Sequence, residues 1–417
     1  MLESVPRVSR YTWVRLWPAY ALLGSSQAIV WLSDFVAKRS LGAPDWVVPL
    51  LLTAFQVSWI FSPALEPLMA RQNAQSLFRK IGLLSYLPML AVAFVAVVPV
   101  GPGGAGEGHL VLFLVLMIAH FAIDTAFIPH RGALLTANFP ARVRGRMYGL
   151  ATAISLVCMT LFSKACGSVL DGDPRWLRFL FPLGGLLGLW ACFLLARIRW
   201  RHGARPAIAD GDGMWREVRG TWGNVLTVFR TDRAFFKYEA GYMLYGVGFL
   251  MFWPIMVLFA EGDLGLSYGS WTSARGVAWP LGIMVATPFA GRLCDKIGVV
   301  RSTALAFALL GSVFASMAFV KTEFGLIAGF AFFGIAMAGV DVGWSLGPLH
   351  FAPKGRSRSY AGIHVAMVGV RSLFAPMFGY TMLKEVGFQA ACLTAATMVL
   401  CGSAVLLLFV PRNAPAA

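Results

Sequence analysis

The stretch "GRLCDKIGVVRS", residues 291–302, separates two long apolar segments with two glycines, one aspartate and three basic side chains. Glycine permits tight turns that other residues resist, so we expect a short charged turn between two regular elements. What those flanking elements are follows from the composition of the chain around them.

The chain of 417 residues is 58% hydrophobic and only 13% charged, with a mean hydropathy of +0.70. A soluble protein carries about 25% charged residues, so lipid is the solvent that this chain fits. Its apolar windows are long enough to cross a hydrocarbon core about 30 Å thick. Backbone groups in lipid must be paired internally, which favours helices. The sequence therefore predicts an all-α polytopic membrane protein.

Twelve transmembrane helices are expected, and the basic residues between them indicate their orientation. The predicted spans are 13–36, 45–70, 78–100, 109–135, 147–170, 175–197, 235–260, 268–291, 299–320, 325–349, 358–383 and 387–410. Of the 35 Lys and Arg, 26 fall at the termini, in the even-to-odd loops and at adjoining helix ends. The six on the opposite side are Lys38, Arg39, Arg175, Arg178, Lys321 and Lys384. This asymmetry predicts cytoplasmic N- and C-termini, in a bacterial inner (plasma) membrane, and accounts for the net charge of +16 without a nucleic-acid partner.

Two similar halves are predicted, residues 1–198 and 235–417, each a bundle of six helices. The segment 199–234 between them is polar and basic, and is read as a cytoplasmic linker that is either an amphipathic helix or a disordered tether. A helix there would place on one side Trp215, Val218, Trp222, Val225 and Leu226. The halves also repeat a motif, "NFPARVRGRMYGL" at 138–150 and "HFAPKGRSRSYAGI" at 350–363. Such repeats are typical of secondary transporters.

The opening stretch resembles the signature loop of the major facilitator superfamily. The matching positions are Gly291, Leu293, Asp295, Lys296, Gly298 and Arg301. The resemblance implies the fold of that superfamily, with two six-helix bundles related by pseudo-two-fold symmetry. It further implies a transporter that works by alternating access, is not an enzyme, needs no cofactor and acts as a monomer.

The resemblance also implies a cytoplasmic gate, in which Asp295 lies near the start of the fifth span. The predicted gate residues are Gly291, Asp295, Lys296, Gly298, Arg301, Arg144, Arg146 and Glu66. Two features depart from the family pattern. The stretch after the second span has Glu66 but no second glycine, and the fifth span lacks the Gly-Pro signature of many drug exporters.

Several polar residues lie inside the predicted spans, where each ionisable side chain costs about 2.5–3.5 kcal/mol near the bilayer centre. They are Asp124, Arg275, Arg371, Asp341, Lys164, Gln27 and His120. In one interpretation Arg275 and Arg371 bind an anion, while Asp124 or Asp341 carries a proton. In the other, these charges pair with one another, Arg371 with Asp341 for example, and only hold helices together. The spacing of His120 and Asp124 could hold a metal, but further ligands are missing and no metal site is predicted.

These observations favour a secondary active transporter, symporter or antiporter, of a small organic solute, with an anionic solute as one option and protons as the coupling ion. Its other partners would be membrane lipids. A drug or metabolite exporter or a uniporter on the same fold is an alternative, as is a transport-inactive sensor. A nucleotide-driven pump is disfavoured because no phosphate-binding loop is present. A membrane enzyme is disfavoured because no nucleophile–base set is apparent.

Overall fold

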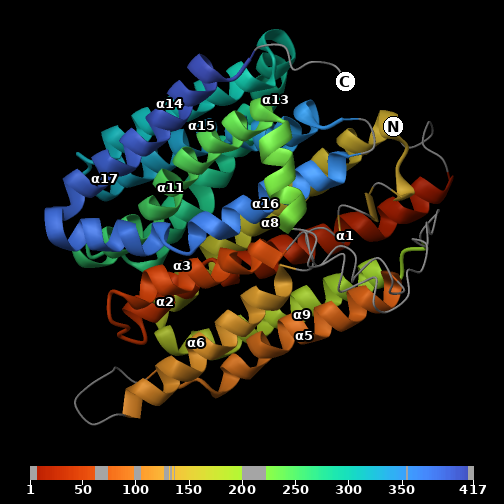
Figure 1. Ribbon diagram of the computed structural model, residues 1–417. Coiled ribbons are helices and arrows are strands. Elements are labelled where there is room, and N and C mark those ends of the chain that lie inside the picture. Colours follow the sequence, from red (N-terminus) through yellow and green to blue (C-terminus); the bar gives the residue numbers. More distant parts are fainter. Residues whose placement is uncertain are drawn as a thin grey trace. The chain divides into compact units, whose positions relative to one another are not determined.

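The computed structural model describes residues 7–61, 74–97, 105–125, 131, 134–135, 137–199, 222–353 and 356–411. Every regular element in these ranges is a helix (Figure 1). The chain divides into two compact units, Met1–Ala43 with Ala64–Val218, and Pro44–Pro63 with Arg219–Ala417. The segment 44–63 thus belongs to the second unit, whereas the boundaries at 198 and 235 stay a prediction.

The first unit is built around α1 and α9. Its elements are α1 (Arg7–Val30), α2 (Ser33–Arg39), α5 (Ala74–Ala91), η2 (Val92–Phe94), α6 (Ala105–Asp124), α8 (Ala141–Gly172), η3 (Pro174–Trp176) and α9 (Leu177–Ala196). Helix α1 packs along α8 and α9, and α5 packs between α9 and α6. Figure 1 shows α5, α6 and α9 lying side by side.

The second unit is built around α11, α14, α15 and α17. Its elements are α3 (Val47–Val57), η1 (Ser58–Phe61), α11 (Arg233–Gly262), α12 (Tyr268–Trp271), the π-helix η4 (Thr272–Ala278), α13 (Trp279–Ile297), α14 (Val299–Met317), α15 (Glu323–Phe351), α16 (Ser357–Ser372) and α17 (Ala375–Phe409). Helix α17 packs along α11 and α14, and α15 packs on α13 and α14, as Figure 1 shows. Asp232 begins α11 by accepting a hydrogen bond from the backbone N–H of Phe235.

The prediction of a polytopic all-helical membrane protein is confirmed. Among the described residues, nine helical stretches are long and apolar enough to span a bilayer. The last of them, Ser359–Phe409, contains two predicted spans, because the backbone leaves the helical conformation at Gly387 (φ 85°). The first two predicted spans fall on helices outside this set, since α1 starts with several arginines and Val47–Phe61 is short.

The opening stretch is more helical than expected. Instead of a turn over 291–302, α13 continues to Ile297 and α14 starts at Val299, so that Gly298 alone separates them. Gly298 has φ 84° and ψ 159°, a conformation open in practice only to glycine. Its N–H still bonds to the carbonyl of Cys294, which closes the last turn of α13. One glycine is therefore sufficient to connect α13 to α14, because the chain changes direction at this residue alone.

Part of the predicted linker is also helical, over residues 222–231. Val225 and Val228 are buried there, whereas Trp222 and Leu226 are exposed. The predicted apolar side is therefore split, with Val225 packed inward and Leu226 facing out. Trp215 and Val218 lie outside the described residues, so the question of an amphipathic helix over the whole segment stays open.

Candidate functional site

Three polar contacts join α11 to α16 inside the second unit, and they form the candidate site. They are Tyr360 Oη donating to Asp232 Oδ2 at 2.9 Å, His364 Nδ1 bonded to Glu239 Oε1 at 2.7 Å, and Arg371 Nη1 donating to the carbonyl of Tyr242 at 2.5 Å. An α-helix returns to nearly the same face after seven residues. Positions 239 and 246 therefore share one face of α11, and positions 364 and 371 one face of α16. We call this row of contacts the α11–α16 seam.

The pair formed by Glu239 and His364 lies in the interior of the unit. Each residue is only 2% exposed. The imidazole ring packs against Trp344, with centroids 4.1 Å apart, and edge-on against Tyr242 at 4.7 Å. Within the described part of the chain, Glu239 Oε2 and His364 Nε2 are buried without a hydrogen-bond partner. Buried polar atoms are normally paired, so unsatisfied ones point to a functional role.

Sequence reasoning missed both members of this pair. Glu239 falls in the predicted span 235–260 and His364 in the span 358–383. An ionisable side chain inside a membrane span needs a partner or a function, and this holds for Glu239 and His364 as it does for Arg371. These two lie closer to the helix starts than to the bilayer centre.

Arg371 lies further along the seam and is only 3% exposed. Its guanidinium occupies the space left by the missing side chain of Gly246, since a Cβ built there would be 2.0 Å from Arg371 Cζ. The ring of Tyr245 lies 5.6 Å from the same carbon. Arg371 Nε has no hydrogen-bond partner. Among the described residues no carboxylate forms an ion pair with Arg371, and Asp341, the partner considered from the sequence, is exposed on α15.

Arg275 has different surroundings, in the π-helix η4. Its guanidinium carbon lies 4.8 Å from the ring centroid of Trp253 and 5.6 Å from that of Trp271, in cation–π contact. Short π-helical segments inside α-helices often occur at functional sites. Arg275 thus faces tryptophans, whereas Arg371 faces tyrosines and the backbone of α11.

A second polar cluster lies in the first unit. His120 is buried on α6, and its Nδ1 lies 2.8 Å from the carbonyl of Ser85 and 3.2 Å from the Ser85 hydroxyl. The ring of Tyr86 packs against it at 5.3 Å. Asp124, one turn further along α6, is half-buried and within electrostatic range of Arg131, a residue that sequence reasoning did not select.

The remaining predicted site residues of the first unit are separate from this cluster's hydrogen bonds. Gln27 is half-buried on α1, and Lys164 is exposed on α8. The described residues hold no group of three or more His, Cys, Asp or Glu that could bind a metal ion.

The predicted gate residues lie at helix ends. Asp295, Lys296 and Arg301 are exposed on either side of the Gly298 break, and Gly291 is half-buried within α13. Arg146 is exposed near the start of α8, where Arg144 also lies. The Arg144 side chain and all of Glu66 are outside the described residues. The gate itself stays a prediction.

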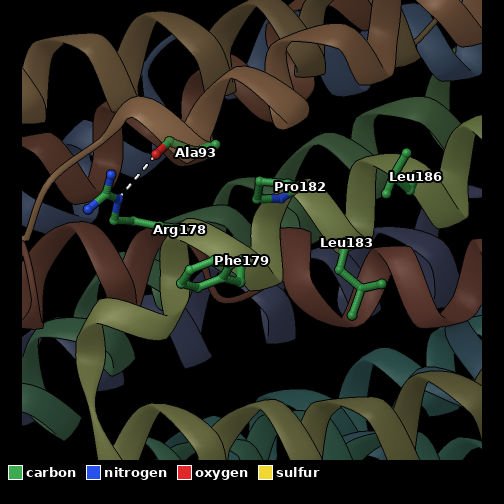
Figure 2. Close-up of a pocket in the computed structure, with 6 residues that line it drawn as sticks. All are labelled: Ala93, Arg178, Phe179, Pro182, Leu183 and Leu186. Carbon is green, nitrogen blue, oxygen red and sulfur yellow. Dashed lines mark hydrogen bonds between the residues drawn. The ribbon is translucent and has the colours of Figure 1, made fainter.

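A surface depression of about 360 Å³ lies on the first unit, away from the predicted site residues. Figure 2 shows Arg178 reaching from α9 to η2, where Nε donates to the carbonyl of Ala93 at 3.1 Å. The other lining residues are Phe179, Pro182, Leu183 and Leu186. Phe179 is 65% exposed, so the depression belongs to an apolar outer surface that suits lipid.

The fold defines a class of protein, the polytopic helical membrane proteins, and solved structures of membrane transporters match nearly the whole chain. A mutant of the nucleoside transporter NupG aligns with a TM-score of 0.68 and 14% identity, covering 95% of this chain and 99% of that one. A D-xylose–proton symporter aligns with a TM-score of 0.68 and 14% identity, covering 96% and 97%. A POT family transporter in complex with a thioalcohol-conjugated peptide aligns with a TM-score of 0.74 and 11% identity, covering 99% of each chain.

Two findings agree with the family that the opening stretch resembles. The family model described as Major Facilitator Superfamily matches residues 239–417, and the solved structures match the fold over nearly the full length. A comparison with curated proteins gives no match. Residues 239–417 are thus similar to the major facilitator superfamily, and the chain has the fold of the solved transporters, in agreement with the resemblance of the opening stretch.

Proposed function

We propose that this transporter moves a small organic solute with an anionic or strongly hydrogen-bond-accepting group, and that protons drive the movement. Arg371 carries the proposal. Its guanidinium is buried, and the described residues give it one hydrogen-bonded backbone carbonyl and no hydrogen-bonded carboxylate. The orientation that goes with the proposal has both termini in the cytoplasm.

A buried guanidinium without a counter-charge is costly, because its lost hydration is only partly replaced. A single carbonyl dipole satisfies one of the five N–H groups of Arg371. A carboxylate or phosphate would accept two parallel hydrogen bonds and supply the missing charge. A substrate with such a group would gain most from this position once alternating access exposes it.

Proton coupling is supported by the ionisable side chains that the helices enclose, among them the pair of Glu239 and His364. One of the solved structures with this fold is a D-xylose–proton symporter. Asp124 and Asp341 are further candidates for proton or substrate contact, together with Arg275.

The test starts with purified protein and a thermal-shift screen of metabolites matched in size, some anionic and some neutral. A ligand at 100 times its dissociation constant stabilises by about 2.7 kcal/mol, which such a screen detects. We expect the anionic solutes to stabilise the protein.

Uptake of the best ligand into proteoliposomes then examines Arg371. The change Arg371→Lys keeps the charge but loses the planar fork, so affinity should fall about 10- to 100-fold, and Arg371→Gln should abolish binding. The control is Arg292→Gln, which removes an exposed arginine of α13. Normal anion transport by Arg371→Gln, or a screen in which only neutral solutes bind, would refute the proposal.

A further inference from the structure

We propose that Glu239 and His364 bind the coupling proton, and that this proton determines whether Arg371 can accept the substrate anion. The inference rests on the proposed function and adds to it the site of coupling and its stoichiometry. It starts from the α11–α16 seam, where the pair and the arginine occupy one continuous row.

The pair is enclosed by residues that cannot solvate a charge well. Both members are 2% exposed, and aromatic rings of Tyr242 and Trp344 cover the imidazole. The pair has no net charge when it holds one proton more than a carboxylate and a neutral imidazole do together, either as imidazolium and carboxylate or as imidazole and carboxylic acid. When that proton leaves, the pair carries one negative charge. In a low-dielectric interior, such a charge needs a nearby positive one.

Among the described residues, Arg371 supplies a positive charge within electrostatic range of Glu239. Its Nη1 is held by the carbonyl of Tyr242, which is three residues from Glu239, or about 4.5 Å along the helix axis. The deprotonated pair and Arg371 together are neutral. Adding a proton to the pair leaves Arg371 with an uncompensated positive charge.

The requirement for zero net charge couples the binding of the proton to the binding of the substrate anion. A monoanion bound at Arg371 restores zero net charge only if the pair holds its proton. An anion without the proton, or a proton without the anion, leaves one net charge inside the protein. The transporter would therefore carry one proton with each monoanion, taking the proton from water on one side and releasing it to water on the other.

The orphaned polar atoms support this assignment. Glu239 Oε2, His364 Nε2 and Arg371 Nε are all buried and lack hydrogen-bond partners. They lie on the two helices of one seam, and each is a position where a proton, a water or a substrate oxygen could bind. Asp341 is exposed and Asp124 half-buried, so neither is enclosed as the pair is.

In the described part of the chain, the groups other than Arg371 that interact electrostatically with the pair, with Arg371 or with the buried tyrosines of α11 are not cationic. They are Tyr238, Tyr242 and Tyr245 on α11, Cys294 on α13 and Asp341 on α15, with Asp232 hydrogen-bonded to Tyr360 at the seam's start. Helix α17 meets α11 through apolar residues such as Val399 and Leu406. Helices α3 and η1 have no ionisable residue. Tyrosine and cysteine are neutral near pH 7.

The seam also provides a route to the pair. Asp232 and Tyr360 are hydrogen-bonded where α11 and α16 begin, and Tyr360 is one helical turn from His364. Asp232 is partly exposed, so the seam begins in contact with solvent. A proton entering at that end would meet the pair before it reached Arg371.

The first test uses the unmodified protein in weakly buffered detergent solution, with an indicator dye and the best anion from the screen. We expect one proton to be taken up per anion bound at alkaline pH. The anion dissociation constant should then rise tenfold per pH unit, as linkage of one proton requires. Anion binding without proton uptake between pH 5 and 9 would overturn the inference.

The second test is Glu239→Gln, which removes the carboxylate, so that the pair can no longer switch between a neutral and a negatively charged state. The variant should bind the anion with an affinity independent of pH, exchange it across the membrane, and lose accumulation driven by a pH gradient. The matched control is Glu261→Gln, at the far end of α11, which should keep the wild-type pH slope. A pH slope in Glu239→Gln equal to that of wild type would overturn the inference.

The outcomes separate the two proposals. If Arg371→Gln abolishes binding while Glu239→Gln keeps the wild-type pH slope, the proposed function stands and the coupling site is wrong. If anions bind normally to Arg371→Gln, the proposed function fails and the inference falls with it. Where Glu239→Gln does not fold, the proton-uptake measurement on unmodified protein still decides.

Discussion

Replacing Gly246 by alanine should displace Arg371 and weaken both folding and substrate binding. The Cβ of an alanine would lie 2.0 Å from Cζ and 2.1 Å from Nε and Nη1 of Arg371. Ordinary contact needs at least 3.4 Å, so the guanidinium must move by about 1.4 Å or more. The hydrogen bond from Nη1 to the carbonyl of Tyr242, now 2.5 Å long, cannot survive such a shift unchanged.

The size of the effect follows from two opposing terms. A hydrogen bond from a charged group contributes about 1.5–3 kcal/mol. Alanine favours the helix over glycine by about 1 kcal/mol, which offsets part of the loss. Gly246→Ala should therefore destabilise the protein by about 0.5–2 kcal/mol. Gly149→Ala on α8, where a Cβ meets nothing within 4 Å, should instead stabilise it by up to about 1 kcal/mol.

The assay is thermal unfolding of both variants in the same detergent, followed by titration with the best ligand of the screen. We expect Gly246→Ala to melt below wild type, Gly149→Ala to melt at or above it, and only the former to lose affinity. If the two alanine variants behave alike in melting and in ligand affinity, the close approach of Arg371 to α11 does not matter as argued.

Two further predictions concern the opening stretch. Gly298→Ala should lower the free energy of unfolding by about 1–3 kcal/mol, because φ 84° is unfavourable for any residue with a Cβ. Thermal unfolding measures this effect, with Gly291→Ala as the control because a Cβ there meets open space. Equal melting temperatures of the two variants would contradict the prediction. Asp295→Asn should shift the transporter toward its inward-open state if Asp295 closes the predicted gate; spin-label distances between α8 and α13 measure that shift, and an unchanged distribution would remove Asp295 from the gate.

Hydropathy was enough to predict a polytopic helical membrane protein, and a few motif residues indicated the family that it resembles. Which segments leave water depends on the apolar content of each window and on the thickness of the bilayer, both of which are local properties. The spacing of Gly291, Asp295 and Gly298 then indicated the superfamily, because that pattern is contiguous. Within this motif, the sequence predicted a turn of several residues, whereas Gly298 alone separates α13 from α14.

The candidate site depended on tertiary structure. Glu239 and His364 are 125 residues apart, and nothing local to either predicts that they meet. The sequence suggested a carboxylate or an anion as the partner of Arg371, whereas packing gives it a backbone carbonyl, an acceptor that every residue carries and no motif marks. Nothing in the sequence distinguishes Gly246 from other glycines in apolar helices. Only the folded structure shows that the guanidinium of Arg371 fills the space that a side chain at position 246 would occupy. Hydropathy determines that a helix is buried in lipid, but the packing of faces distant in sequence determines which polar groups share its interior.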